Sequence, residues 1–354
     1  MDESILLTAL LRDVSRSFYL TLRVLPSRVR PQIGLAYLLA RATDTIADTK
    51  IVPVDQRVEA LERLRSFIAG QSLAPPDMTR FQPECEYSKG HRGQPPSPDG
   101  AASTAERLLL SRIGEAAALM HRFSTEDQGL VQAVLDTITS GQLLDLERFA
   151  RVAPGQVMAL RNEVELDDYL YRVAGCVGEF WTRICRAHLF PRADVDESFL
   201  LERGIRFGKG LQLTNILRDL SRDLQQGRCY LPMAQLRARG IAPADLLNPH
   251  FEQRFRPVFD RHCRIAIAHL RAGWAYTNHI PRSCVRVRLA CAWPILIGKR
   301  TLERVCEGPV LSAGCSTKIS RKEVRRILMR SIFTYPWPGL WRAQWREIPA
   351  DKQA

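Results

Sequence analysis

The sequence has no apolar run long enough to cross a bilayer. A spanning helix needs about 20 apolar residues, and the longest candidate, Leu289 to Gly298, is shorter and contains Pro294. The first residues, Met-Asp-Glu-Ser, also lack the basic segment that begins a secretory signal peptide. These two absences predict a cytoplasmic protein, and peripheral attachment to the inner face of a membrane is the alternative.

Cysteine- and histidine-based chemistry is also missing. The nine cysteines contain no CxxC pair, and the seven histidines form neither an HExxH motif nor a cluster. A histidine-based metal site is therefore not expected, and the odd number of cysteines fits a reducing compartment. A glycine-rich dinucleotide fingerprint is absent too.

The sequence does have an excess of positive charge, with a formal net charge of +13. This excess favours anionic partners such as nucleic acid, anionic lipid headgroups and diphosphate esters. The basic residues are scattered, however, and the sequence contains no recognised DNA- or RNA-binding motif. We therefore expect no nucleic-acid partner.

Helical periodicity covers most of the chain, and strand signals are sparse. Residues 5–70 are rich in helical pattern, with a break marked by Pro26 and Pro31. Further helices are predicted over 105–122, 126–150, 165–190, 196–225, 233–239, 252–278, 284–308 and 320–333. The sequence thus predicts an all-α bundle around a central cavity, as a single domain over residues 1–335.

Two segments fall outside this pattern. Residues 72–104 are rich in Pro, Gly and Ser without periodicity, which predicts a flexible surface insertion. The tail, residues 336–354, is aromatic and basic. Its aromatic side chains fit either a cap on the bundle or an interfacial foot on a membrane.

Two short acidic motifs carry most of the chemical information. Asp44 and Asp48, and again Asp219 and Asp223, are four residues apart within apolar helical runs. Residues i and i+4 share a helix face, where two like charges cost roughly 0.2–0.5 kcal/mol. A cation would offset that repulsion, and Mg²⁺ is the natural candidate because it bridges carboxylates to substrate phosphates.

Polar residues accompany the first motif. Arg41 lies three residues before Asp44, and Tyr37 lies one turn further back. Taken alone, this group would also fit an exposed acidic helix end with a surface ion pair. The first motif therefore does not decide between a site and a solvated surface.

The second motif belongs to a longer polar stripe through apolar positions. Its members recur at spacings of three and four residues: Gln212, Asn215, Asp219 and Asp223. Amide and carboxylate oxygens together suit a hydrated Mg²⁺ and a diphosphate. Cations for phosphate oxygens are nearby in Arg218, Arg222 and Arg228.

Six segments occur in a fixed order along the chain: SRSF at 15–18, YLLARATDTIAD at 37–48, YRVAGCVG at 171–178, QLTNILRDLSRD at 212–223, GRCYLP at 227–232 and KISR at 318–321. Together they resemble the squalene/phytoene synthase family of head-to-head prenyl transferases. The resemblance implies an isoprenoid-synthase α-fold in which both acidic motifs line one cavity. It also implies two prenyl diphosphates as substrates, held through Mg²⁺, with Mn²⁺ as the alternative metal.

The resemblance assigns roles to individual residues. The implied metal ligands are Asp44, Asp48, Asn215, Asp219 and Asp223. The implied contacts to diphosphate come from Ser17, Phe18, Tyr37, Arg41, Gln212, Asn215, Arg218 and Arg228. The four aspartates and Tyr171 are the implied catalytic residues, with Tyr171 suited to proton transfer or to contact with a carbocation. Gly175 and Gly178 fit close helix packing as well as close approach of a substrate.

In such a reaction one diphosphate leaves, and the alkene of the second chain attacks the resulting allylic cation. A cyclopropylcarbinyl diphosphate forms, and its ionisation and rearrangement give a C30 or C40 chain. A dry, apolar pocket protects the cations from water.

The product is the finer question. The segments Leu289 to Pro294 and Gly178 to Trp181 resemble those of squalene synthases, which favours two farnesyl diphosphates, presqualene diphosphate as intermediate and NADPH as reductant. A phytoene synthase acting on two geranylgeranyl diphosphates, or a dehydrosqualene synthase without reduction, is the alternative. A non-catalytic assembly factor with the same fold is a more remote one. The sequence leaves the oligomeric state open.

Overall fold

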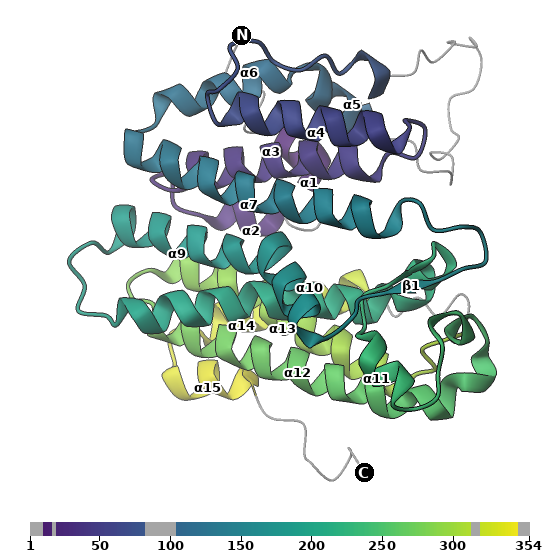
Figure 1. Cartoon of the computed structure of the whole chain (residues 1–354). Coiled ribbons are helices and arrows are strands. Elements are labelled where there is room, and N and C mark those ends of the chain that lie inside the picture. The colour runs from purple at the N-terminus through teal and green to yellow at the C-terminus, as the bar shows by residue number, and fades with distance from the viewer. Residues whose placement is uncertain (1–9, 16–18, 82–103, 313–318, 346–354) are drawn as a thin grey trace, which may run out of the picture. The chain divides into compact units, whose positions relative to one another are not determined.

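The computed structural model describes residues 10–15, 19–81, 104–312 and 319–345 (Figure 1). The chain divides into two compact units. The first unit comprises Met1–Arg23, Ser27–Arg151 and Arg183–His188, and the second comprises Val24–Pro26, Val152–Thr182 and Leu189–Ala354.

The first unit is built from helices. In chain order these are α1 (Leu11–Ser15), α2 (Tyr19–Val24), α3 (Arg30–Asp48), α4 (Val54–Ile68), the 3₁₀-helix η3 (Thr79–Phe81), α5 (Thr104–Ser111), α6 (Ile113–Ala118), the 3₁₀-helix η4 (Leu119–Arg122) and α7 (Thr125–Phe149). Helix α3 packs against α4, α5, α6 and α7 and is therefore the central element of this unit.

Helix α3 forms the core of the first unit because its apolar residues recur at helical spacing. Leu35, Leu38, Leu39 and Ile46 are all fully buried. The partner helix α7 begins at a cap in which the Ser124 hydroxyl accepts a hydrogen bond from the Asp127 backbone N–H at 3.2 Å. Two long helices with matching apolar faces thus fix the axis along which Asp44 and Asp48 are presented.

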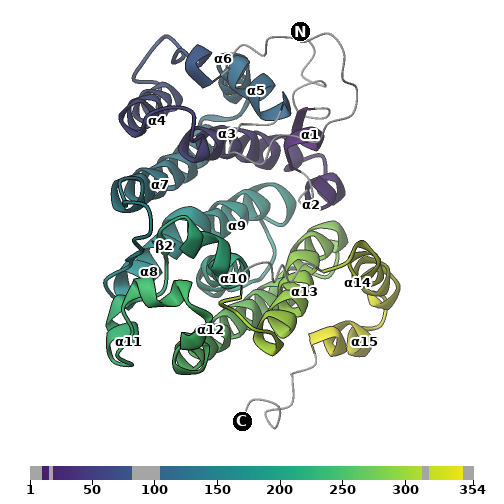
Figure 2. The same cartoon turned by 90° about the vertical axis from the view of Figure 1, so that its right-hand side faces the viewer.

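The second unit contains the remaining elements. They are β1 (Met158–Ala159), α8 (Glu163–Leu170), the π-helix η5 (Tyr171–Gly175), α9 (Cys176–Leu189), α10 (Glu197–Gln225), β2 (Arg228–Cys229), α11 (Met233–Arg237), the 3₁₀-helices η6 (Pro243–Leu247) and η7 (Pro249–Phe251), α12 (Glu252–His279), α13 (Val285–Glu307), α14 (Arg321–Thr334), α15 (Pro338–Arg342) and the 3₁₀-helix η8 (Ala343–Trp345). Helix α10 packs along α12 and α13, and α14 packs on α13 (Figure 2).

Glycines bring the backbones of η5 and α9 into direct contact with the backbone of α10. A Cβ added to Gly178 would lie 1.9 Å from the Gly204 carbonyl oxygen, and one added to Gly208 would lie 2.1 Å from the Ala174 carbonyl oxygen. No side chain larger than hydrogen fits at such a crossing. Close helix packing, one of the two roles that the sequence left open for Gly178, therefore accounts for this glycine.

The all-α expectation is confirmed, and most predicted helices lie within a few residues of their observed bounds. The predicted helix 105–122 is divided into α5, α6 and η4, and 165–190 is divided into α8, η5 and α9. A two-residue parallel pairing of β1 with β2 was not predicted. Within the described residues, no helix is both long and apolar enough to cross a bilayer.

The predicted insertion lies partly outside the described residues, which end at 81 and resume at 104. Its described beginning is anchored, because Met78 and Phe81 are buried. In the tail, Trp341 and Trp345 stack on Trp274 with ring centroids 5.2 and 6.4 Å away. The aromatic-cap interpretation is therefore correct for these two tryptophans.

We predict that Gly178→Ala destabilises the fold by about 3 kcal/mol, because the new methyl group must separate two backbones. The matched control is Gly129→Ala on α7, where an added Cβ meets nothing within 4 Å. That change should instead stabilise by about 0.5–1 kcal/mol, since alanine favours the helix. Urea unfolding of both variants measures the difference, and equal midpoints would contradict the packing argument.

Candidate functional site

One face of α3 carries the first set of predicted residues. Tyr37, Arg41, Asp44 and Asp48 are spaced by four, three and four residues, so they form one stripe along the helix. The opposite side is occupied by the buried leucines of the core. The stripe is thus held in place by a rigid helix and not by a loop.

Arg41 is shared between two carboxylates. Its guanidinium donates to Asp44 Oδ2 at 2.5 Å and also pairs with Glu106 of α5. Glu106 is buried, and a buried carboxylate needs a charged partner. Glu106 and Asp44 therefore share this guanidinium.

Burial, followed by the neighbouring carboxylates, raises the pKa of Asp44 to about 7. The principal cause is desolvation, followed by the nearby Asp48 carboxylate; Arg41 opposes the shift and Glu106 adds to it. The Asp44 side chain nevertheless keeps 42% of its surface exposed, so an ion can reach it. A bound cation would therefore stabilise the ionised form of Asp44.

The position of the motif on the helix adds to this need. Helix α3 ends at Asp48, and its last turn contains no basic residue. The C-terminal end of a helix carries partial negative charge, so carboxylates are unfavourable there. One compensating contact is present, because buried Arg57 donates to the Ala47 carbonyl oxygen at 2.6 Å.

Helix α10 carries the second set of predicted residues in the same way. The half-buried stripe consists of Gln212, Asn215, Asp219 and Asp223. It is flanked by buried apolar residues, namely Leu213, Ile216, Leu217, Leu220 and Leu224. The predicted stripe is therefore present, with polar groups bordered by a hydrophobic surface.

Asp219 is held by arginine, as Asp44 is. Arg218 donates from Nε to Oδ1 at 3.0 Å and from Nη2 to Oδ2 at 2.6 Å, which makes a two-pronged ion pair. Arg222 lies 4.0 Å from the same carboxylate. Asn215 donates to the Gln212 side-chain oxygen at 3.5 Å, so the amides of the stripe also face one another.

The end of α10 leads directly to Arg228. Gly227 has a φ of 79°, and a Cβ there would lie 3.0 Å from the Gln156 carbonyl oxygen. Only glycine suits this left-handed turn. Strand β2 then pairs with β1, with Arg228 opposite Met158. The turn thus returns the chain beside the end of α10 and places a cation in the segment that follows Asp223.

Tyr171 begins the π-helix η5 in the same unit as α10. Its hydroxyl donates to Glu179 Oε2 at 3.2 Å, and the Lys209 Nζ of α10 lies 5.8 Å from its ring centroid. Lys209 in turn donates to Asp167 Oδ1 at 2.7 Å. Single π-turns often occur at functional sites, and here the turn gives Tyr171 a carboxylate partner that could accept its proton.

The donor set fits Mg²⁺ by its chemistry, because it consists of hard carboxylate and amide oxygens. Within the described part of the chain, no three acidic, histidine or cysteine side chains form a preassembled metal site. The two aspartates of each motif would have to be completed by water and by phosphate oxygens, which is how Mg²⁺ commonly binds. The two sets belong to different units of the chain.

Ser17 and Phe18, which the sequence predicted to contact diphosphate, lie outside the described residues. Two residues of the clusters were not predicted. Glu106 lies in the first turn of α5, where an acidic residue is ordinary, and Glu179 lies eight residues after Tyr171. Neither position gives a sequence signal, because both roles depend on tertiary packing.

Comparisons with known proteins agree with the motifs. The sequence model of squalene/phytoene synthase matches residues 11–318. A presqualene diphosphate synthase from Rhodopseudomonas palustris is 29% identical over 283 residues, which are 80% of each chain. A bifunctional lycopene cyclase/phytoene synthase from Blakeslea trispora is 29% identical over 235 residues, which are 64% of this chain and 32% of that protein.

The fold is likewise that of known structures. The complex of TcSQS with the ligand BPH1237 aligns with a TM-score of 0.72 at 20% identity, covering 98% of this chain and 94% of the other. At that identity the likeness concerns the fold alone. The expected isoprenoid-synthase helical fold is confirmed.

We predict that Asp44→Asn stabilises the metal-free protein at pH 8, because it removes an ionised carboxylate that the fold disfavours. The gain should be only about 1 kcal/mol, since solvent screens the partly exposed side chain. The folded-state pKa, about 7, is above the ordinary value of 3.8. The ionised carboxylate therefore destabilises the fold increasingly as pH rises from about 3.8, and fully above about 7. The gain should shrink at pH 5.

Urea unfolding in the presence of a chelator measures this effect at both pH values. Asp55→Asn, on an exposed carboxylate of α4 that pairs with Arg151, is the control and should give no gain. If Asp44→Asn is less stable than the wild type at pH 8, the ionised carboxylate does not destabilise the metal-free fold, and the argument is wrong.

Proposed function

Because the chain belongs to the squalene/phytoene synthase family of head-to-head prenyl transferases, we propose that it joins two farnesyl diphosphates to form presqualene diphosphate. The resemblance found in the sequence motifs is thereby confirmed at the level of the family. The choice of substrate, the metal and the roles of individual residues are the proposal.

The single observation that carries the proposal is the repeated arrangement of arginine, aspartate and helix end. In α3, Arg41 pairs with Asp44, and in α10, Arg218 pairs with Asp219. Each motif thus holds an acceptor for metal and a donor for phosphate side by side. A prenyl diphosphate offers both a metal-binding oxygen set and a charge that guanidinium recognises.

We assign the metal-binding role to Asp44, Asp48, Asn215, Asp219 and Asp223. Bound Mg²⁺ would neutralise the developing charge on the departing diphosphate and so assist ionisation. If a metal were bound by the aspartates, the paired arginines could donate to diphosphate oxygens instead. Arg41 and Arg218 would then move from carboxylate to phosphate, and Tyr37, Gln212 and Arg228 would complete the polar contacts.

For the carbon chemistry, the protein has to stabilise charge and to exclude water from the site. Ionisation at C1 of one farnesyl diphosphate releases diphosphate and leaves an allylic cation. The C2=C3 alkene of the second molecule attacks that carbon, and loss of a proton closes the cyclopropane ring. Apolar residues beside the α10 stripe, such as Leu213 and Ile216, suit the isoprenoid chains and exclude water from the cation.

We propose that Tyr171 handles the proton that this ring closure releases. Its hydroxyl already donates to Glu179, and the ring face can stabilise positive charge. Glu179 would act as a positioning residue, because it orients the hydroxyl. A phenol with a carboxylate partner can accept a proton while passing its own to that partner.

The fate of presqualene diphosphate separates the alternatives. The sequence predicts NADPH-dependent reduction to squalene, whereas a relative named presqualene diphosphate synthase suggests release after the first step. Of the two segments that favoured reduction, Leu289 to Pro294 has a packing role, since Cys291 and Trp293 are buried in α13 and Trp293 donates to Ser331 Oγ at 2.8 Å. Phytoene synthesis from geranylgeranyl diphosphate remains the second candidate, as it is the activity named for another relative.

The proposal predicts that the purified chain consumes farnesyl diphosphate with Mg²⁺ and accumulates presqualene diphosphate when NADPH is omitted. Mass analysis with NADPH then decides the last step: squalene indicates reduction, and unchanged presqualene diphosphate indicates release. Asp219→Asn should lower turnover at least about 100-fold, whereas Glu202→Gln on the same helix should keep it. Conversion of geranylgeranyl but not farnesyl diphosphate would overturn the substrate, and no conversion of either would favour a non-catalytic assembly factor.

We further predict that Tyr171→Phe lowers kcat by about 100-fold with little change in KM, because only the proton-transferring hydroxyl is lost. Glu179→Gln should lower kcat less and shift its pH profile, since the amide still accepts the hydrogen bond but cannot take the proton. Steady-state kinetics on both variants tests this. Unchanged kcat in Tyr171→Phe would assign the tyrosine to packing.

A further inference from the structure

The end of the second unit exposes a cluster of large apolar side chains. We call it the α14–α15 face; it consists of Met329, Ile332, Phe333, Trp337 and Leu340. Phe333 is 64% exposed, Trp337 58% and Leu340 55%. Single exposed apolar residues are ordinary, but five of them within twelve residues, over the end of α14 and the start of α15, mark an interaction surface.

Basic residues continue the same side of α14. Lys322, Arg325 and Arg326 precede Met329 at helical spacing, so α14 presents a basic first half and an apolar second half on one side. With Arg321 and Arg330, five exposed cations lie on this helix. None of the five forms an ion pair with a described residue, so they remain available to an anionic partner.

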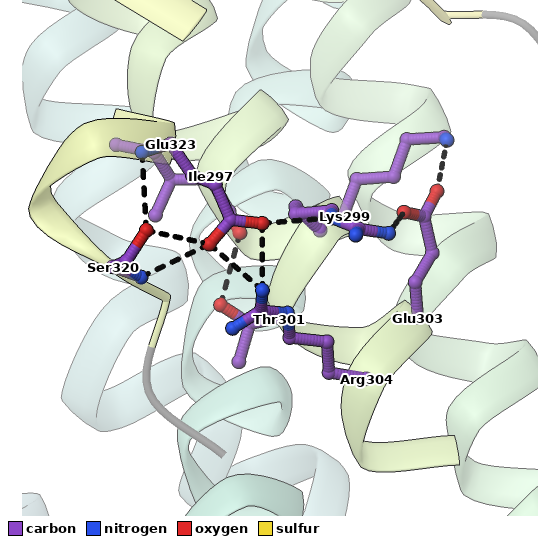
Figure 3. A network of polar contacts seen from close by, with 8 residues as sticks. Ile297, Lys299, Thr301, Glu303, Arg304, Ser320 and Glu323 are labelled. Carbon is purple, nitrogen blue, oxygen red and sulfur yellow. Dashed lines mark hydrogen bonds and ion pairs between the residues drawn. The ribbon is translucent and has the colours of Figure 1, made fainter. Parts of the chain in front are cut away.

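The helix that carries this face is fixed at its beginning (Figure 3). Glu323 accepts from Arg304 Nη2 of α13 at 2.7 and 2.8 Å, and it closes a capping box with Ser320. Arg300 links Glu323 to Glu303 on α13. Because the start of α14 is anchored to α13, the exposed apolar residues of α14 lie on an ordered helix.

The tail is fixed at its other end by the remaining aromatic residues. Trp341 is buried, donates to Asn278 Oδ1 at 2.9 Å and lies 5.5 Å from the Arg288 guanidinium. Tyr335 packs edge-on against Trp341 and donates to the Arg282 carbonyl oxygen at 2.6 Å. The fold therefore buries Trp341 and Trp345 but leaves Trp337 outside, between two prolines.

We propose that the α14–α15 face docks the protein on a membrane that contains anionic lipids. Apolar and tryptophan side chains enter the boundary between headgroups and acyl chains, and arginines bind lipid phosphates. A protein partner would need a groove that is both apolar and acidic. A membrane with anionic lipids has an apolar interior and a negatively charged surface together. The charge of the face and the +13 net charge both favour the membrane.

Vesicle sedimentation with the full chain and no substrate tests the proposal independently of catalysis. Binding is expected to vesicles in which about a third of the phosphatidylcholine is replaced by phosphatidylglycerol. It should weaken with added salt, since the Lys and Arg contacts are screened. Phe333→Ser with Leu340→Ser should lower the partition coefficient at least about tenfold, whereas Val164→Ser, on an exposed apolar residue of α8, should leave it unchanged.

Charge is tested with a matched pair of variants. Arg325→Gln with Arg326→Gln should lower binding about tenfold or more, because each basic residue near the surface adds to the attraction to anionic lipids. Arg237→Gln with Arg239→Gln removes the same charge from exposed positions at the end of α11 and beyond, and it should bind like the wild type. Equal losses in both pairs would mean that net charge alone, and not this face, attracts the vesicle.

Tryptophan fluorescence locates the contact. Trp337 is exposed, whereas the other five tryptophans are buried. Vesicle binding should therefore shift the emission to shorter wavelength, and Trp337→Phe should abolish the shift while keeping the binding. Failure of the wild type to bind anionic vesicles, or a dimer that disappears with the Phe333 and Leu340 substitutions, would overturn the proposal.

Discussion

The acidic motifs place carboxylates close together near the C-terminal ends of two helices, where they repel each other. Helix α3 ends at Asp48, and α10 ends two residues after Asp223, so each acidic motif lies where the helix itself is negative. In α3 the pKa of Asp44 is raised, mainly because burial disfavours the charged form and then because the Asp48 carboxylate is near. If the motifs bind a divalent cation together with diphosphate, as proposed, the bound cation would offset this repulsion.

The surrounding residues relieve this repulsion only in part. Arg41 is shared with buried Glu106 and so cannot neutralise Asp44 alone. In the second unit, the glycine contact between α9 and α10 fixes the backbone that carries Tyr171 against the helix that carries Asp219. Rigidity of this kind suits a site that must hold opposing charges at set positions before substrate arrives.

The long helices and the two polar stripes were predictable because each depends on local spacing. The apolar period fixed α7, α10 and α12 within a few residues, and the α10 stripe was explicit in the sequence. Glu106, Glu179 and the pairing of β1 with β2 were not predictable, since each is created by contacts between distant segments. The tail shows the same limit, because composition could not tell which tryptophans are buried.

The central claim, that the acidic motifs bind divalent metal together with diphosphate, is most directly tested by titration with Mn²⁺. Electron paramagnetic resonance of the free ion measures its binding to the full chain with and without inorganic diphosphate. The account predicts that diphosphate strengthens Mn²⁺ binding and that Asp48→Asn and Asp223→Asn each weaken the diphosphate-dependent part. Binding that is unchanged by diphosphate, or by both substitutions, would contradict it.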